Sequence, residues 1–175
     1  MPKAHLRFGA ALALQLGLLA FIPAGQLWIR ATGQTVLLKT APVDPYSILS
    51  GYYMTLGYEI GDTRNLPGWD KLDWQEGAEC WVLLAPDEGG AWKALSVHKQ
   101  VPPVPAGQAV IRGRYRRWRG PDYGIETYYI PEKVRHEMAD VFRNSRERPL
   151  VEVKIAKSGA AAIVRIHAGN RTFEY

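Results

Sequence analysis

The stretch Tyr52-Tyr53-Met54-Thr55-Leu56-Gly57-Tyr58-Glu59-Ile60 decides how this chain folds. It is rich in tyrosine, threonine and isoleucine, which favour strands. Alternate residues of a strand point to opposite faces. One face is therefore apolar, with Tyr52, Met54, Leu56, Tyr58 and Ile60, and the other carries Tyr53, Thr55, Gly57 and Glu59. The sequence predicts a strand over residues 52–60 whose apolar face packs on the core.

Short β-prone segments continue through the rest of the chain. Strands are predicted at 35–40, 80–84, 92–98, 109–118, 124–130, 150–157 and 160–166, with a loop at 61–78. The turns Asp87-Glu88-Gly89-Gly90 and Ser158-Gly159 join neighbouring strands into hairpins. Residues 132–146 predict one amphipathic helix, with the apolar stripe Val134, Met138, Val141 and Phe142. We expect a mainly β domain, an antiparallel barrel or a sandwich with one helix.

The first thirty residues predict a separate segment. Phe8 to Ile29 carries no charge, and as a helix it would span about 33 Å, enough for a hydrocarbon core of about 30 Å. Lys3 and Arg7 precede it, which favours an N-terminus in the cytoplasm. We therefore expect a single transmembrane anchor at 1–30 in the inner or cytoplasmic membrane, and an extracytoplasmic β-rich domain at 31–175.

Two other interpretations of this segment stay open. A cleaved signal peptide has a shorter apolar core and small residues before its cleavage site. Here the run is long, and Ile22 occupies the third position before a cut after Ala24. A buried core helix is the other alternative, although a helix that is apolar on all sides is uncommon at the end of so small a domain.

Composition and charge exclude several classes. A hydrophobic fraction of 47% with 22% charged residues is typical of a folded chain. Three of the 22 basic residues lie in 1–30 and no acid does, so the rest has 19 basic and 17 acidic residues, a net charge of only +2. Such a domain lacks the electrostatic footprint of a nucleic-acid binder. Cys80 is the only cysteine, so no intrachain disulfide and no cysteine-based zinc site can form.

Two blocks of the sequence resemble a known family. Gly51, Tyr53, Leu56 and Tyr58, preceded by Val43-Asp44-Pro45, fit the motif of the bacterial GDYXXLXY proteins, and Tyr123–Glu132 is similar to a second block of that family. The family has no established activity, and its members are membrane proteins, often beside multi-pass domains. The resemblance therefore implies a membrane partner and no particular chemistry. Tyr52 replaces the Asp of the motif, so any acid–base or metal-binding role that the resemblance implies for that Asp is not carried over to this chain.

Alternating arginines form the first candidate binding site. Arg112, Arg114 and Arg116 share one face of the strand predicted at 109–118, and Arg117 and Arg119 extend this strip. The strip could bind lipid head groups or the acids of a partner. The alternative is a solvated strand face whose arginines pair with acids on neighbouring strands, such as Glu126.

The second candidate site combines Glu126, Tyr128 and Glu132, whereas Tyr53 is a candidate binding residue beside the arginine strip. Two carboxylates, Glu126 and Glu132, together with the Tyr128 phenol could bind a cation or run acid–base chemistry. The alternative is that Glu126 forms a salt bridge and that Glu132 lies in the first turn of a helix, where the helix dipole favours an acidic residue. No histidine pair has metal-ligand spacing, and no nucleophile, phosphate-loop or dinucleotide motif is present. The sequence therefore predicts no cofactor and no catalytic residue.

We expect a membrane-anchored accessory or interaction domain that is not an enzyme and works with the bilayer and an integral membrane partner. An alternative is an envelope ligand-binding or sensor domain that uses the arginine strip with Tyr53. The third is a hydrolase whose site has no recognisable motif. A pocket lined by Arg114, Glu126 and Tyr128 would favour the second hypothesis, and a nucleophile–base pair within hydrogen-bond reach would favour the third. The oligomeric state stays open.

Overall fold

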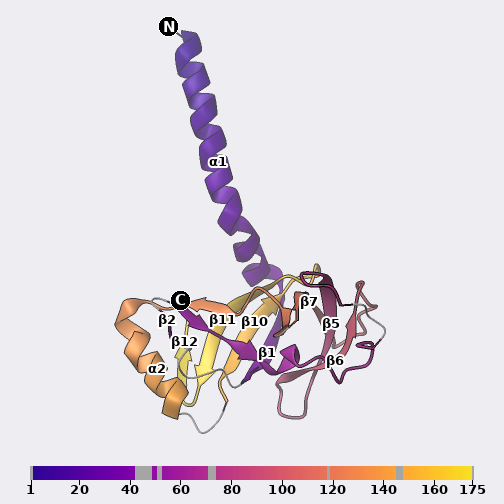
Figure 1. The fold of residues 1–175 in the computed structure, drawn as a ribbon. Coiled ribbons are helices and arrows are strands. Elements are labelled where there is room, and N and C mark those ends of the chain that lie inside the picture. The colour runs from indigo at the N-terminus through magenta and orange to yellow at the C-terminus, as the bar shows by residue number, and fades with distance from the viewer. Residues whose placement is uncertain are drawn as a thin grey trace.

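The computed structural model describes residues 2–41, 49–50, 53–70, 74–117, 119–144 and 148–174. Val43-Asp44-Pro45, Gly51 and Tyr52 lie outside these ranges, as does Trp118 at the end of the arginine strip. The long helix α1 (Pro2–Thr32) projects from a β-rich body, and the shorter α2 (Arg135–Asn144) lies at one side of that body (Figure 1).

The described strands are mostly short, as the turn residues between them predict. They are β1 (Gln34–Ala41), β2 (Leu49–Ser50), β3 (Tyr53–Thr55), β4 (Gly57–Tyr58), β5 (Glu79–Pro86), β6 (Trp92–His98), β7 (Ala109–Arg116), β8 (Gly120–Asp122), β9 (Thr127–Tyr129), β10 (Leu150–Ile155), β11 (Ala161–Ala168) and β12 (Arg171–Phe173). Two 3-10 turns, η1 (Glu59–Gly61) and η2 (Glu132–Val134), complete the elements.

The main sheet is a mixed, curled half-barrel. Its order is β12-β11-β10-β1-β6-β5-β7-β8, with β4 also paired to β1, and β2-β3-β9 forms a smaller sheet. The prediction of a mainly β fold is confirmed. The prediction of an antiparallel barrel or sandwich is corrected to a mixed half-barrel, because β1 pairs in parallel with β6 at Leu38 and Trp92. The long connection between β1 and β6 makes this parallel pairing feasible, and no local pattern announces it.

Curling brings the β10–β11 hairpin turn onto β7. The Arg112 amide donates to the Gly159 carbonyl at 2.8 Å. Gly159 has φ of +76°, and a Cβ there would lie 2.7 Å from the Trp81 ring. Only glycine fits both the left-handed backbone and this close approach, so the Ser158-Gly159 turn sets how far the sheet curls.

The strand predicted at 52–60 is divided, although its faces are as expected. β3 ends at Thr55 and β4 ends at Tyr58, after which η1 begins. Met54, Leu56, Tyr58 and Ile60 are all buried, whereas Tyr53 is 38% exposed. The interruption lies at Leu56, whose amide donates to the Glu126 carbonyl at 2.7 Å instead of joining either strand ladder.

Other boundaries differ where the local signal is weak. The strand predicted at 124–130 is only β9, and β8 and β12 were not predicted. The helix predicted at 132–146 begins as η2 and continues as α2. Within its stripe Met138 is fully buried, and Val134, Val141 and Phe142 pack against the core as expected. An ion pair between Glu137 and Arg171 ties α2 to β12.

Helix α1 is bent, so the single transmembrane helix predicted at the N-terminus is in the structure a bent helix pair. Its Arg7–Phe21 and Pro23–Thr32 parts meet at 42°. Pro23 explains the bend, because proline has no amide hydrogen and its ring clashes with the preceding turn. Among the described residues no single helix has the length and apolar composition of a membrane span, but the bent pair together does. This is compatible with a membrane span or a signal sequence.

The apolar side chains of α1 are exposed. Large examples along its length are Phe8, Leu12, Leu14, Leu16, Leu18, Leu19, Phe21, Leu27 and Trp28. The buried core helix is therefore excluded. The last turns of α1 contact the body: a Cβ on Gly33, the residue after α1, would lie 3.0 Å from both the Ile155 amide nitrogen and the Lys154 side chain. The end of α1 is thus seated tightly on β10.

Candidate functional site

The arginine face, defined here as Arg112, Arg114 and Arg116, has the geometry that alternation predicts. These three residues of β7 are exposed and alternate with buried Ile111, Gly113 and Tyr115. The acids around them come from neighbouring segments: Glu79 lies 3.7 Å from Arg112, and Arg116 lies 3.5 Å from Glu76 and 3.7 Å from Asp122. The ion-paired interpretation therefore gains support, but with other acids than Glu126.

A small polar hollow lies beside this face. It has a volume of about 220 Å³ and is lined by the charged residues Arg112, Arg114, Glu79 and Asp122, together with Gly113, Tyr123 and Gly124. Two guanidinium groups and two carboxylates nearly cancel in charge. Exposed ion pairs of this kind contribute only about 0–1 kcal/mol each to stability, so the hollow has neither a strong field for anions nor a strong field for cations.

Glu126 belongs to a carboxyl pair behind the hollow. Its side chain hydrogen-bonds Asp122, and its Oε1 accepts from the Tyr123 amide at 2.6 Å. Burial, followed by the hydrogen bond and the charge of Asp122, raises the pKa of Glu126 from 4.5 to about 7. The hydrogen bond from Glu126, aided by Gly124 and Arg116, lowers the pKa of Asp122. The Glu126 and Asp122 carboxyl groups therefore share one proton near neutral pH. Glu126 lies in the loop that connects β8 to β9.

Two buried tyrosines join the motif strand to the second block. The Tyr58 hydroxyl donates to the Ile125 carbonyl at 2.6 Å, and the Tyr123 hydroxyl donates to the Ile60 carbonyl at 2.7 Å. Burial raises the pKa of both phenols well above the ordinary value. With the Leu56 amide bonded to Glu126, these reciprocal bonds favour a structural role for the described part of the motif.

Replacing Tyr58 by phenylalanine should lower the unfolding free energy by about 1–3 kcal/mol, because the buried Ile125 carbonyl loses its donor. Urea unfolding of the purified chain measures this loss. Tyr129→Phe is the matched control, since Tyr129 is 73% exposed and surface changes usually stay within about 0.5 kcal/mol. Equal losses in the two variants would contradict a structural role for the Tyr58 hydroxyl.

Tyr53 and Tyr128 lie on opposite faces of the small sheet. Tyr53 is opposite Tyr129 in the strand ladder, and their rings meet edge to face with centroids 6.4 Å apart. Tyr128 is opposite Met54 and is buried. Arg114, Glu126 and Tyr128 do not come together in either of two hollows that the described residues form. Arg114 lines the polar hollow, and Tyr128 lines a different cavity.

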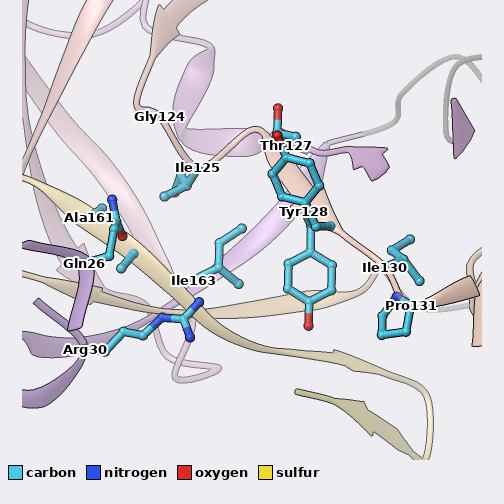
Figure 2. Close-up of a pocket in the computed structure, with 12 residues that line it drawn as sticks. Gln26, Arg30, Gly124, Ile125, Thr127, Tyr128, Ile130, Pro131, Ala161 and Ile163 are labelled. Carbon is cyan, nitrogen blue, oxygen red and sulfur yellow. The ribbon is translucent and has the colours of Figure 1, made fainter. Parts of the chain in front are cut away.

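That cavity is the larger one, and it is called the groove below. It has a volume of about 600 Å³ and lies between Gln26 and Arg30 of α1, the 124–131 segment, and Ala161–Ile163 of β11. Figure 2 shows the Arg30 guanidinium beside Ile163, with the Tyr128 ring between Ile163 and Pro131. No pattern in the sequence predicted the groove. The one available signal was the spacing of Gln26 and Arg30, which places both on one helix face.

Catalytic chemistry has little geometric support in the described residues. Ser96 Oγ lies 2.8 Å from His98 Nε2, so a hydroxyl–imidazole pair exists. It lies along one strand and lines neither hollow, and within the described ranges the imidazole has no carboxylate partner. Burial raises the pKa of the Cys80 thiol to about 12, which keeps it protonated. The described residues include no group of three or more His, Cys, Asp or Glu side chains placed to hold a metal ion. The hydrolase hypothesis stays a prediction.

Four tryptophans of the β-rich body, Trp69, Trp74, Trp81 and Trp92, serve packing. Trp69 and Trp74 have ring centroids 4.7 Å apart, and both rings contact Tyr115. Trp69, Trp74 and Trp92 pack against the core, and Trp81 is buried beneath Arg112, whose guanidinium lies 6.0 Å from its ring. Such aromatic clusters contribute mainly through buried area.

Comparison with known proteins agrees with the resemblance of the two blocks. No curated protein and no solved structure matches the chain significantly. A family model described as GDYXXLXY protein matches residues 15–166, which include the end half of α1 and every strand from β1 to β10. This match covers most of the sequence, so the chain belongs to the GDYXXLXY protein family.

Proposed function

We propose that this chain is an extracytoplasmic accessory domain that α1 holds at a membrane, where it works with an integral membrane partner. The observation that carries the proposal is the contrast along α1. Its apolar side chains are exposed from Phe8 to Trp28, whereas its last turn is seated on the sheet at Gly33. A bilayer would cover this apolar surface, since large exposed apolar patches on a protein mark interaction or membrane sites.

Charge sets the proposed orientation. Lys3 and Arg7 precede the apolar run, and Arg30 follows it. Because basic flanks are retained in the cytoplasm, the N-terminus lies inside and the β domain outside. The nearly balanced arginine face and the structural bonds of the motif favour an interaction role over a catalytic one.

The chain should remain with membranes after a carbonate wash, and a reporter that is active only outside the cytoplasm should be active when fused after Tyr175. The control is a chain in which Leu14 and Leu18 are changed to Arg. It should be found in the soluble fraction, because each charge costs about 2.5–3.5 kcal/mol at the centre of a span.

Two outcomes would contradict the proposal. An inactive C-terminal reporter on a membrane-bound chain would reverse the orientation. Release of a chain whose N-terminus is Gly25 would identify α1 as a cleaved signal, because Ala24 would then be the last residue removed.

A further inference from the structure

The groove lies in the seam that the half-barrel leaves open. β12 pairs only with Ile166–Ala168 of β11, so the beginning of β11 is a sheet edge. The 124–131 segment forms the opposite wall. Among the described residues no backbone hydrogen bond crosses from 124–131 to 161–163. The volume of about 600 Å³ is within the roughly 300–1,000 Å³ that is typical of small-molecule sites.

The walls of the groove are mostly apolar, with Gln26 and Thr127 as neutral polar side chains and Arg30 as the one cation among the lining residues. Ile125, Ile130, Pro131 and Ile163 line it, together with the Tyr128 ring. None of the lining residues is acidic, and Arg30 has no ion pair within the described ranges. An apolar body with one anionic group complements this arrangement, because arginine binds phosphate or carboxylate through two parallel hydrogen bonds.

The position of the groove indicates which amphiphile would reach it. Gln26 and Arg30 are on the last two turns of α1: Gln26 lies near the end of the uncharged run, and Arg30 directly follows its last residue, Ile29. If that run lies in the bilayer, Arg30 lies at the depth of the phosphate groups, where its guanidinium can hydrogen-bond a lipid phosphate. The groove would then open at the membrane surface.

From this geometry we propose that the groove binds one anionic phospholipid, with its phosphate on Arg30 and an acyl chain along the apolar walls. The inference depends on the membrane anchoring proposed above. An extended peptide could add to the open edge of β11, but the groove offers a peptide few polar side chains and no acid, so a lipid fits better.

The test is native mass spectrometry of the full chain, purified in mild detergent and incubated with phosphatidylglycerol. We expect one tightly retained lipid per chain and much weaker retention of phosphatidylcholine, which has no net negative charge. Arg30→Glu should reduce retention by about tenfold or more, as expected for the loss of a charge-assisted hydrogen bond. Arg64→Glu is the charge control, because Arg64 is exposed and lies outside the groove.

A second variant tests the apolar walls. Thr127 is exposed and lines the groove, so Thr127→Trp should fill it and also reduce retention, without emptying the core. Thr127→Val keeps the size and should retain lipid. Equal retention by the wild type, Arg30→Glu and Thr127→Trp would place any bound lipid elsewhere on α1 and overturn the proposal. Equal binding of oleate would assign the site to free fatty acids, and binding only of extended peptides would assign it to a partner strand; either result overturns it too.

Failure of this inference and failure of the anchor are distinguishable. If the chain stays in carbonate-washed membranes but retains no lipid in the groove, the anchor proposal is supported and the lipid-site proposal is contradicted. A chain cut after Ala24 loses the anchor but keeps Gln26 and Arg30, and the same lipid assay on that form then tests the groove alone.

Discussion

Between about pH 5 and about pH 8 the protein should lose up to about 3 kcal/mol of unfolding free energy through Glu126 alone. Its pKa in the folded state is raised from 4.5 to about 7, so the folded protein keeps a proton that the unfolded chain releases. This stabilisation is fully present below the unfolded pKa and is lost as the pH rises through the folded one. The lowered pKa of Asp122 has the opposite effect on the unfolding free energy, because it adds stability as the pH rises. This effect occurs at more acidic pH, outside this window.

Unfolding by urea at a series of pH values measures the effect, and Glu126→Gln isolates it. The glutamine amide can replace the shared proton toward Asp122 and still accept from the Tyr123 amide. The variant should therefore show a flatter pH profile and exceed the wild type in stability at about pH 8. Glu88→Gln, in the exposed β5–β6 turn, should keep the wild-type slope. Identical slopes for the wild type and Glu126→Gln would show that Glu126 titrates as an ordinary carboxyl.

Sequence periodicity predicted the parts of the fold that depend on neighbouring residues. Alternation gave the exposed and buried faces of β3 and β7, and the 3.6-residue period gave the stripe on α2. The hairpins at Asp87–Gly90 and Ser158-Gly159 were correct because glycine turn chemistry is local. These features need no knowledge of what lies across the core.

The features of the fold that the sequence did not predict depend on contacts between residues far apart in the chain. The parallel pairing of β1 with β6 joins residues more than fifty positions apart, and β8 and β12 are too short to show a period. The groove arises where α1, the 124–131 segment and β11 meet. Glu126 was expected to face arginine, but the turn after β8 places it against Asp122, which no spacing rule indicates.

Leu56→Ala should be the most destabilising single change in the motif, with a loss of about 2–5 kcal/mol of unfolding free energy. Leu56 is only 3% exposed and packs in the core between Met54 and Tyr58. The alanine keeps the amide that donates to Glu126, so the loss comes from the empty volume and not from the backbone bond. Urea unfolding at about pH 6 measures it, within the range where many proteins are most stable.

Tyr53→Ala is the matched comparison, since Tyr53 is only three residues away but lies on the other face. Tyr53 is 38% exposed and its ring contacts the ring of Tyr129, so the loss should be about 0.2–1 kcal/mol, as for a cross-strand pair. A ratio of several-fold between the two losses supports a motif in which leucine holds the core and Tyr53 remains available at the surface. Equal losses would contradict the assignment of Leu56 to the core face and of Tyr53 to the solvent face of this segment.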